Sequence, residues 1–134
     1  MQLKYLFTGL CLLLVILCGH ALAAPVADQM SPDTLAVQGR WVRTDAPYVI
    51  ELRHAEAGQM QATYYNPKPI HVAKTEIAEQ DGLLYVLIEL QDVNYPGSTY
   101  VISYDRTQDT LQGLYFVPAS QQSFEVTFVR QVAQ

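Results

Sequence analysis

Hydrophobic and polar residues alternate with a period of two along short stretches between residues 39 and 132. This pattern is typical of β-strands with one buried face, and no stretch there keeps the 3.6-residue period of an amphipathic helix. Short segments containing Gly, Pro, Asn or Asp interrupt the alternation at fairly even intervals. The pattern predicts eight strands, at residues 40–44, 48–54, 59–66, 70–78, 83–92, 99–105, 110–117 and 124–130.

The connections between these strands are too short to contain a crossover helix, so neighbouring strands are expected to pair antiparallel and in chain order. A meander of this kind hides its edges either by closing into a barrel or by folding over as a sandwich. Strict chain-order pairing favours closure. We therefore predict an all-β fold, an eight-stranded antiparallel up-and-down meander closed into a barrel.

Two local features add detail to this prediction. The strand at residues 83–92 is apolar on both faces, so its outer side is expected to be covered by the N-terminal segment or by a partner. Glu89 shares a face with Tyr85 and Leu87 on that strand. The dipeptide Pro96-Gly97 is expected to form a type II turn, because Pro fixes the first central dihedral and Gly accepts the positive one.

Residues 1–23 have the features of a secretory signal peptide, with Lys4 near the start, an apolar run from Leu10 to Cys18 and small residues up to Ala23. We expect cleavage after Ala23. Residues 24–37 contain two prolines and no period, which predicts a flexible leader, and residues 38–132 form the predicted barrel domain.

The protein is accordingly expected outside the cytoplasm, either in a periplasm or secreted. Lipoprotein processing at Cys18 is disfavoured, since the preceding residue, Leu17, is larger than such processing accepts. The apolar run is also too short to span a bilayer comfortably, so no stable membrane insertion is expected after signal removal.

The composition narrows the class of molecule further. Half of the residues are hydrophobic and 16% are charged, which excludes a disordered chain. Lys and Arg number 8 against 13 Asp and Glu, for a net charge of -5, so a nucleic-acid partner is not expected. Both cysteines, Cys11 and Cys18, lie in the predicted signal peptide, and the rest of the chain can form no disulfide or thiolate site.

The run Gly39-Arg40-Trp41 opens the first predicted strand, and Arg130 lies near the end of the last one. This combination resembles the lipocalins and the wider calycin group. The resemblance implies that Trp41 lies across a closed end of the barrel, with Arg130 packed over its indole. We thus expect Gly39, Trp41 and Arg130 to form a structural clasp joining the first strand to the last. A shorter domain, with no C-terminal helix, departs from that family.

The segments at residues 64–70 and 92–100 are similar to those of small, uncharacterised exported bacterial proteins, for which no activity is implied. Tyrosine is abundant, and five tyrosines are predicted to line the barrel and bind a ligand: Tyr64, Tyr85, Tyr100, Tyr104 and Tyr115. The first hypothesis is therefore binding of a small hydrophobic or aromatic molecule, held by stacking and phenol hydrogen bonds. Alternatively, the rings simply fill a small barrel. The protein would then be a protein–protein interaction module, an inhibitor or a scaffold that contacts an envelope protein.

Catalytic and metal chemistry are not indicated. No serine lies in a Gly-x-Ser-x-Gly run, and the two histidines outside the predicted signal, His54 and His71, lack the spacing of metal ligands. Glu89 is the one carboxylate whose neighbours on the same face are apolar. We expect no enzyme activity, no cofactor and no metal.

Overall fold

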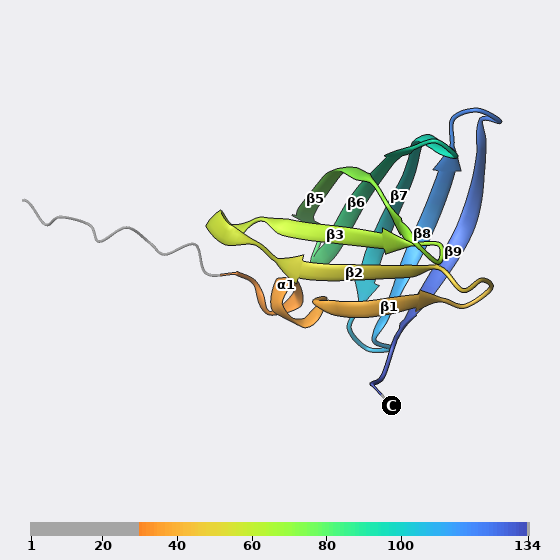
Figure 1. Cartoon of the computed structure of the whole chain (residues 1–134). Helices are drawn as coiled ribbons and strands as arrows, with labels where there is room; N and C mark the ends of the chain where they lie inside the picture. The colour runs from red at the N-terminus through yellow and green to blue at the C-terminus, as the bar shows by residue number, and fades with distance from the viewer. Residues whose placement is uncertain (1–29, 134) are drawn as a thin grey trace, which may run out of the picture.

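The computed structural model describes residues 30–133, so the predicted signal peptide lies outside the described residues. The predicted all-β antiparallel meander is confirmed. The strands form one sheet in the order β4-β3-β2-β1-β9-β8-β7-β6-β5, and it curls into a nearly closed barrel (Figure 1). The elements are α1 (Pro32–Ala36), β1 (Gly39–Arg43), β2 (Val49–His54), η1 (Glu56–Gly58), β3 (Met60–Tyr65), β4 (Pro69–Ile70), β5 (Val72–Gln80), β6 (Leu83–Asp92), β7 (Tyr95–Asp105), β8 (Thr110–Val117) and β9 (Gln122–Arg130).

The strand predicted at residues 70–78 is divided in two, which gives nine strands rather than eight. β4 pairs with β3, whereas β5 pairs with β6 at the other edge of the sheet. His71 lies between them, where its backbone N–H donates to the Asp92 carboxylate at 2.9 Å and its carbonyl accepts from the N–H of Gln91 at 2.9 Å. The chain therefore passes from one sheet edge to the other at His71.

The hairpin between β6 and β7 turns at Val93 and Asn94, so the turn predicted at Pro96-Gly97 is wrong. Pro96 and Gly97 lie inside β7, beside a register shift in its pairing with β6. Gly97 has a φ of +82°. Some β-bulges place one residue at a positive φ, which glycine adopts without steric cost. Gly97 serves a β-bulge here rather than a tight turn.

Of the segment predicted as a flexible leader, residues 24–37, the first six residues lie outside the described part, and the remainder contains the short helix α1. Ser31 caps the helix, because its hydroxyl accepts from the N–H of Thr34 at 3.2 Å, and Pro32 occupies the first turn. Val37, just after the helix, is fully buried. Local capping and burial of Val37 thus order this part of the chain. No helix within residues 30–133 has the length and apolar character to cross a membrane.

Side chains of alternate residues fill the barrel interior, as the period of two requires. In β6 these are Leu84, Val86, Ile88 and Leu90, each at most 1% exposed. The largest fully buried side chains of the interior are Trp41, Tyr64, Tyr100 and Phe128. The core therefore combines branched aliphatic side chains with large aromatic ones.

Candidate functional site

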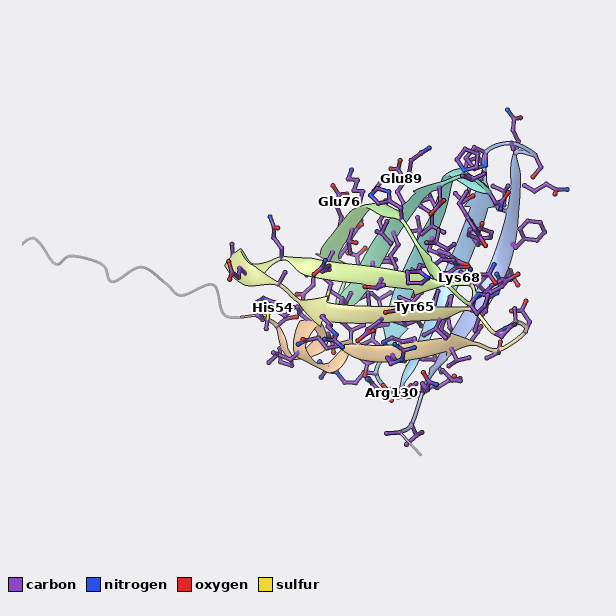
Figure 2. All side chains as sticks on the ribbon, in the orientation of Figure 1. His54, Tyr65, Lys68, Glu76, Glu89 and Arg130 are labelled. Atoms are coloured by element: carbon purple, nitrogen blue, oxygen red, sulfur yellow. The ribbon has the colours of Figure 1, made fainter. Side chains whose placement is uncertain are left out.

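The barrel has two different ends. α1 and the connection between β7 and β8 lie at one end, called the closed end, where Arg130 is also found. The connections β1–β2, β6–β7 and β8–β9 lie at the other, called the open end. Figure 2 shows His54 beside α1 and Lys68 at the opposite end of the same pair of strands. A functional site at either end would be built from several strands at once.

The closed end contains the three residues of the predicted clasp. Trp41 is fully buried and directly paired with Arg130 across β1 and β9, and the Arg130 guanidinium carbon lies 4.2 Å from the centroid of the indole. Gly39 has a φ of +131°, and a Cβ at that position would lie 2.8 Å from Nη1 of Arg130. A side chain at residue 39 would thus displace the guanidinium. The three residues join the first strand to the last.

Tyr104, one of the five predicted ligand-binding tyrosines, lies at this closed end. Its ring lies 6.0 Å from that of Trp41, and its hydroxyl donates to Asp109 at 2.9 Å. Asp109 also accepts two hydrogen bonds from Arg130, at 2.7 and 2.8 Å, which lower the pKa of its carboxyl. Asp109 is a functional part of the clasp that sequence reasoning missed, because it appeared only as a turn residue.

The open end gathers aromatic rings around one guanidinium. Tyr100 is stacked on Tyr115 at 4.4 Å and lies 5.6 Å from Tyr64. Tyr64 in turn lies 6.2 Å from Tyr48 and 5.9 Å from Tyr95. We call these residues, with the arginine described below, the open-end cluster: Arg43, Tyr48, Tyr64, Tyr95, Tyr100 and Tyr115. Three of the five predicted ligand-binding tyrosines therefore lie together.

The inner layer of the open-end cluster is closed to solvent. Tyr64 and Tyr100 are 1% and 0% exposed, and their hydroxyls are hydrogen-bonded to one another at 3.2 Å. Burial raises the pKa of Tyr100 to about 12 and raises that of Tyr64 further. Both phenols stay neutral at physiological pH, so this layer offers hydrogen-bonding groups but no charge.

The outer layer consists of Tyr48, Tyr95 and Tyr115, which are half-buried, and two of these rings, Tyr48 and Tyr115, lie beside Arg43. The Arg43 side chain is 10% exposed, and its guanidinium lies 5.4 Å from the Tyr48 centroid and 6.0 Å from the Tyr115 centroid. It donates to both oxygens of Asp45, at 2.6 and 3.0 Å. Sequence reasoning missed Arg43, although its two-residue separation from Trp41 placed it on the inward face of the first strand.

Tyr85 lies on the outer face of the barrel, so its assignment to the interior is wrong. The buried residues of β6 are the even-numbered ones, and Tyr85, Leu87 and Glu89 share the opposite face. Because this strand is apolar on both faces, its sequence could not indicate which one points inward. Glu89 shares a face with Tyr85 and Leu87, as expected, but that face is external.

The inner rings of the open-end cluster, Tyr64 and Tyr100, are buried, so a ligand would contact the outer layer. The surface depressions of about 550 and 590 Å³ lie elsewhere. The first is lined by Asp33 and Arg106, among others, and the second by Arg40 and Gln131. A small molecule at the open end would accordingly stack on half-buried rings rather than enter a deep cavity.

The histidines do not come together. His54 ends β2 near the closed end, whereas His71 lies beside Gln91, whose carbonyl is 3.1 Å from its Nδ1. Within residues 30–133, no group of three or more His, Cys, Asp or Glu side chains is placed to hold a metal ion.

Comparisons of the chain with protein families, with curated proteins and with solved structures gave no match.

Proposed function

We propose that this is a lipocalin-like binding protein, exported after removal of residues 1–23, that holds a small aromatic molecule at its open end and catalyses no reaction. The observation that carries the proposal is the open-end cluster, in which two half-buried tyrosine rings flank a guanidinium with little solvent exposure. Planar rings bind other planar rings by stacking, and phenol and guanidinium donors fix an oxygen on the ligand.

The polarity of this cluster favours binding over mere filling of the barrel. Apolar residues of similar volume would fill the open end at least as stably as a near-buried Arg43 and a hydroxyl pair of Tyr64 and Tyr100, since desolvating such groups costs free energy. Polar groups gathered where packing alone does not need them point to recognition. The ligand we expect is flat and carries a hydrogen-bond acceptor directed at Arg43.

Kinship with the lipocalins and export are also part of the proposal. The kinship is supported by the pairing of Trp41 with Arg130 at one end of a nearly closed barrel. Similarity to small exported bacterial proteins, carried by residues 64–70 and 92–100, agrees with the signal-peptide composition of residues 1–23. Detection of the mature N-terminus by mass spectrometry of the exported protein tests cleavage after Ala23.

The ligand proposal is tested with two probes of the same carbon skeleton, the flat 2-naphthol and its saturated analogue decahydro-2-naphthol. We expect 2-naphthol to bind with a dissociation constant below about 1 mM. Two-dimensional amide NMR should show its largest shifts at Arg43, Tyr48 and Tyr115. The saturated probe, which cannot stack, should bind about tenfold more weakly.

Two variants carry the same chemical change at different places. Tyr115→Leu removes a ring of the outer layer and should weaken 2-naphthol binding about tenfold, because stacking is lost. Tyr85→Leu alters the outer face of β6 and should leave binding unchanged. Equal affinity of both variants for 2-naphthol, or shifts confined to the outer face of β6, would contradict the proposal.

A further inference from the structure

The outer side of the barrel carries an apolar surface that is separate from the open-end cluster. Strand pairing places Leu87, Val101 and Leu114 side by side on β6, β7 and β8, with Phe116 on the adjoining row. Val101, Leu114 and Phe116 are 45%, 48% and 39% exposed, respectively. We call these four residues the outer apolar face. Adjacent exposed apolar side chains of this kind mark interaction sites more often than scattered ones.

Carboxylates stand at both ends of the central row of this face. The register runs Glu76, Leu87, Val101, Leu114 and Glu125 across five strands, so an acid lies on either side of the apolar centre. On the next row Glu89 adds a third carboxylate, and Figure 2 shows Glu76 and Glu89 on β5 and β6, on the outside of the barrel.

Only one cation lies among these rows of the described surface. Lys74 is paired with Glu89 in the strand register, and its Nζ lies 2.8 Å from the Glu76 carboxylate. These rows therefore carry three carboxylates and one ammonium group, which lies beside Glu76 and Glu89. The surface around the apolar centre has a net negative charge, which favours an approaching surface of opposite sign.

The spacing of the strands indicates how wide a partner of the outer apolar face can be. Neighbouring strands lie about 4.8 Å apart, so Leu87 and Leu114 are separated by about 10 Å and the two flanking acids by about 19 Å. An α-helix with its side chains is about 10 to 12 Å wide. A helix lying along the strands would cover the apolar centre, and long cationic side chains on its edges would reach the carboxylates.

We propose that the outer apolar face docks a cationic amphipathic helix of a partner protein. A second copy of this chain is a poorer fit, because a twofold contact would bring Glu76 or Glu125 of one copy against a carboxylate of the other. An anionic lipid surface would be repelled by the same acids. The proposal is independent of ligand binding at the open end, which lies on different side chains.

The test uses a synthetic peptide of about 18 residues, with a leucine stripe flanked by lysines, which as a helix is about 27 Å long. Its counterpart carries glutamate in place of lysine. We expect the lysine peptide to bind in fluorescence anisotropy titrations and the glutamate peptide to bind at least tenfold more weakly. Raising the salt from about 0.05 to about 0.5 M should weaken binding of the lysine peptide severalfold, since screening reduces the attraction of exposed charges.

Leu114→Ser should weaken lysine-peptide binding about tenfold. The matched control is Val129→Ser, because Val129 is 43% exposed on the outer side of β9, away from the outer apolar face. The control should bind as the parent does, and circular dichroism confirms that both variants fold.

Equal weakening by the two serine variants, or equal binding of the two peptides, overturns the proposal. So does sedimentation showing self-association that Leu114→Ser abolishes, which would assign the face to a second copy. Cosedimentation with phosphatidylglycerol vesicles that the same variant abolishes would assign it to lipid, and would equally overturn the proposal.

Discussion

The Arg130 guanidinium lies over the Trp41 indole and also donates hydrogen bonds to backbone carbonyls of the segment before β1. Its Nη1 donates to the carbonyl of Gln38 and its Nη2 to that of Ala36, both at 2.7 Å. The indole Nε1 of Trp41 donates to the carbonyl of Val37 at 2.8 Å. Two side chains paired across β1 and β9 thus hold three successive carbonyls and seal the closed end.

Arg130→Ala should lower the free energy of unfolding by about 1 to 3 kcal/mol, through lost packing on the indole and through unpaired carbonyls. Urea denaturation measures the change. Arg53→Ala is the control. That side chain is 76% exposed, so its removal should change the free energy of unfolding by less than about 1 kcal/mol. An unchanged urea midpoint for Arg130→Ala would show that the clasp does not stabilise the barrel.

Gly113→Ala should lower the free energy of unfolding more than Gly82→Ala does. A Cβ at Gly113 would overlap the carbonyl oxygen of Val101 and lie 2.8 Å from Cα of Ile102, so the backbone of β7 would have to move. We expect a loss of about 3 kcal/mol. Gly82 has a φ of +78° with nothing within 4 Å, so alanine there meets only backbone strain, about 1 kcal/mol. Thermal unfolding of the two variants ranks them, and the reverse order would contradict this packing argument.

Alternation in the sequence was enough to predict most strands, because burial on one face imposes a period of two whatever the fold does elsewhere. The predicted and observed bounds agree for β6 and β8. Alternation could not show which residues face inward where a strand is apolar on both sides. β6 is apolar on both faces, so Tyr85 was assigned to the wrong side. The break at His71, where the chain leaves one sheet edge for the other, was missed because residues 70–78 contain no Gly or Pro to mark it.

The open-end cluster was predicted only in part, for a related reason. Inward-facing tyrosines of separate strands could be recognised one by one, but which of them meet depends on the pairing register. Tyr100 faces Tyr115 directly across β7 and β8, whereas Tyr104, four residues further along, reaches the opposite end of the barrel. Arg43 was passed over because a charged residue at a strand end normally lies in solvent.

Glu51→Gln should reduce the sensitivity of the fold to acid. Hydrogen bonds from Arg53, with the charge of Arg40 nearby, hold the pKa of the Glu51 carboxyl below its ordinary value of 4.5. A lowered pKa contributes stability above the ordinary value, which is lost as the pH falls through the folded-state pKa. The variant should be about 1 kcal/mol less stable at pH 7 and should lose less between about pH 5 and pH 3.

Urea midpoints measured at several pH values test this expectation. Glu125→Gln is the matched control, because Glu125 is exposed on the outer face of β9 and should leave the pH dependence as it is in the parent. Parallel pH profiles of Glu51→Gln and the parent protein would rule out Glu51 as a source of acid sensitivity.

Thr75→Val should weaken the seam of the barrel, between β3 and β5. The Thr75 hydroxyl accepts from the backbone N–H of Ala62 at 3.3 Å, where one side chain replaces the ladder of backbone bonds found between the other neighbouring strands. Valine has nearly the same shape but no acceptor, so it leaves the N–H of Ala62 without this partner. We expect a loss of about 1 to 2 kcal/mol, with faster hydrogen exchange at the Ala62 amide.

Thr127→Val, the same change on the outer face of β9, should alter stability by less than about 0.5 kcal/mol. Unchanged protection of the Ala62 amide in Thr75→Val would show that the barrel is closed by other contacts.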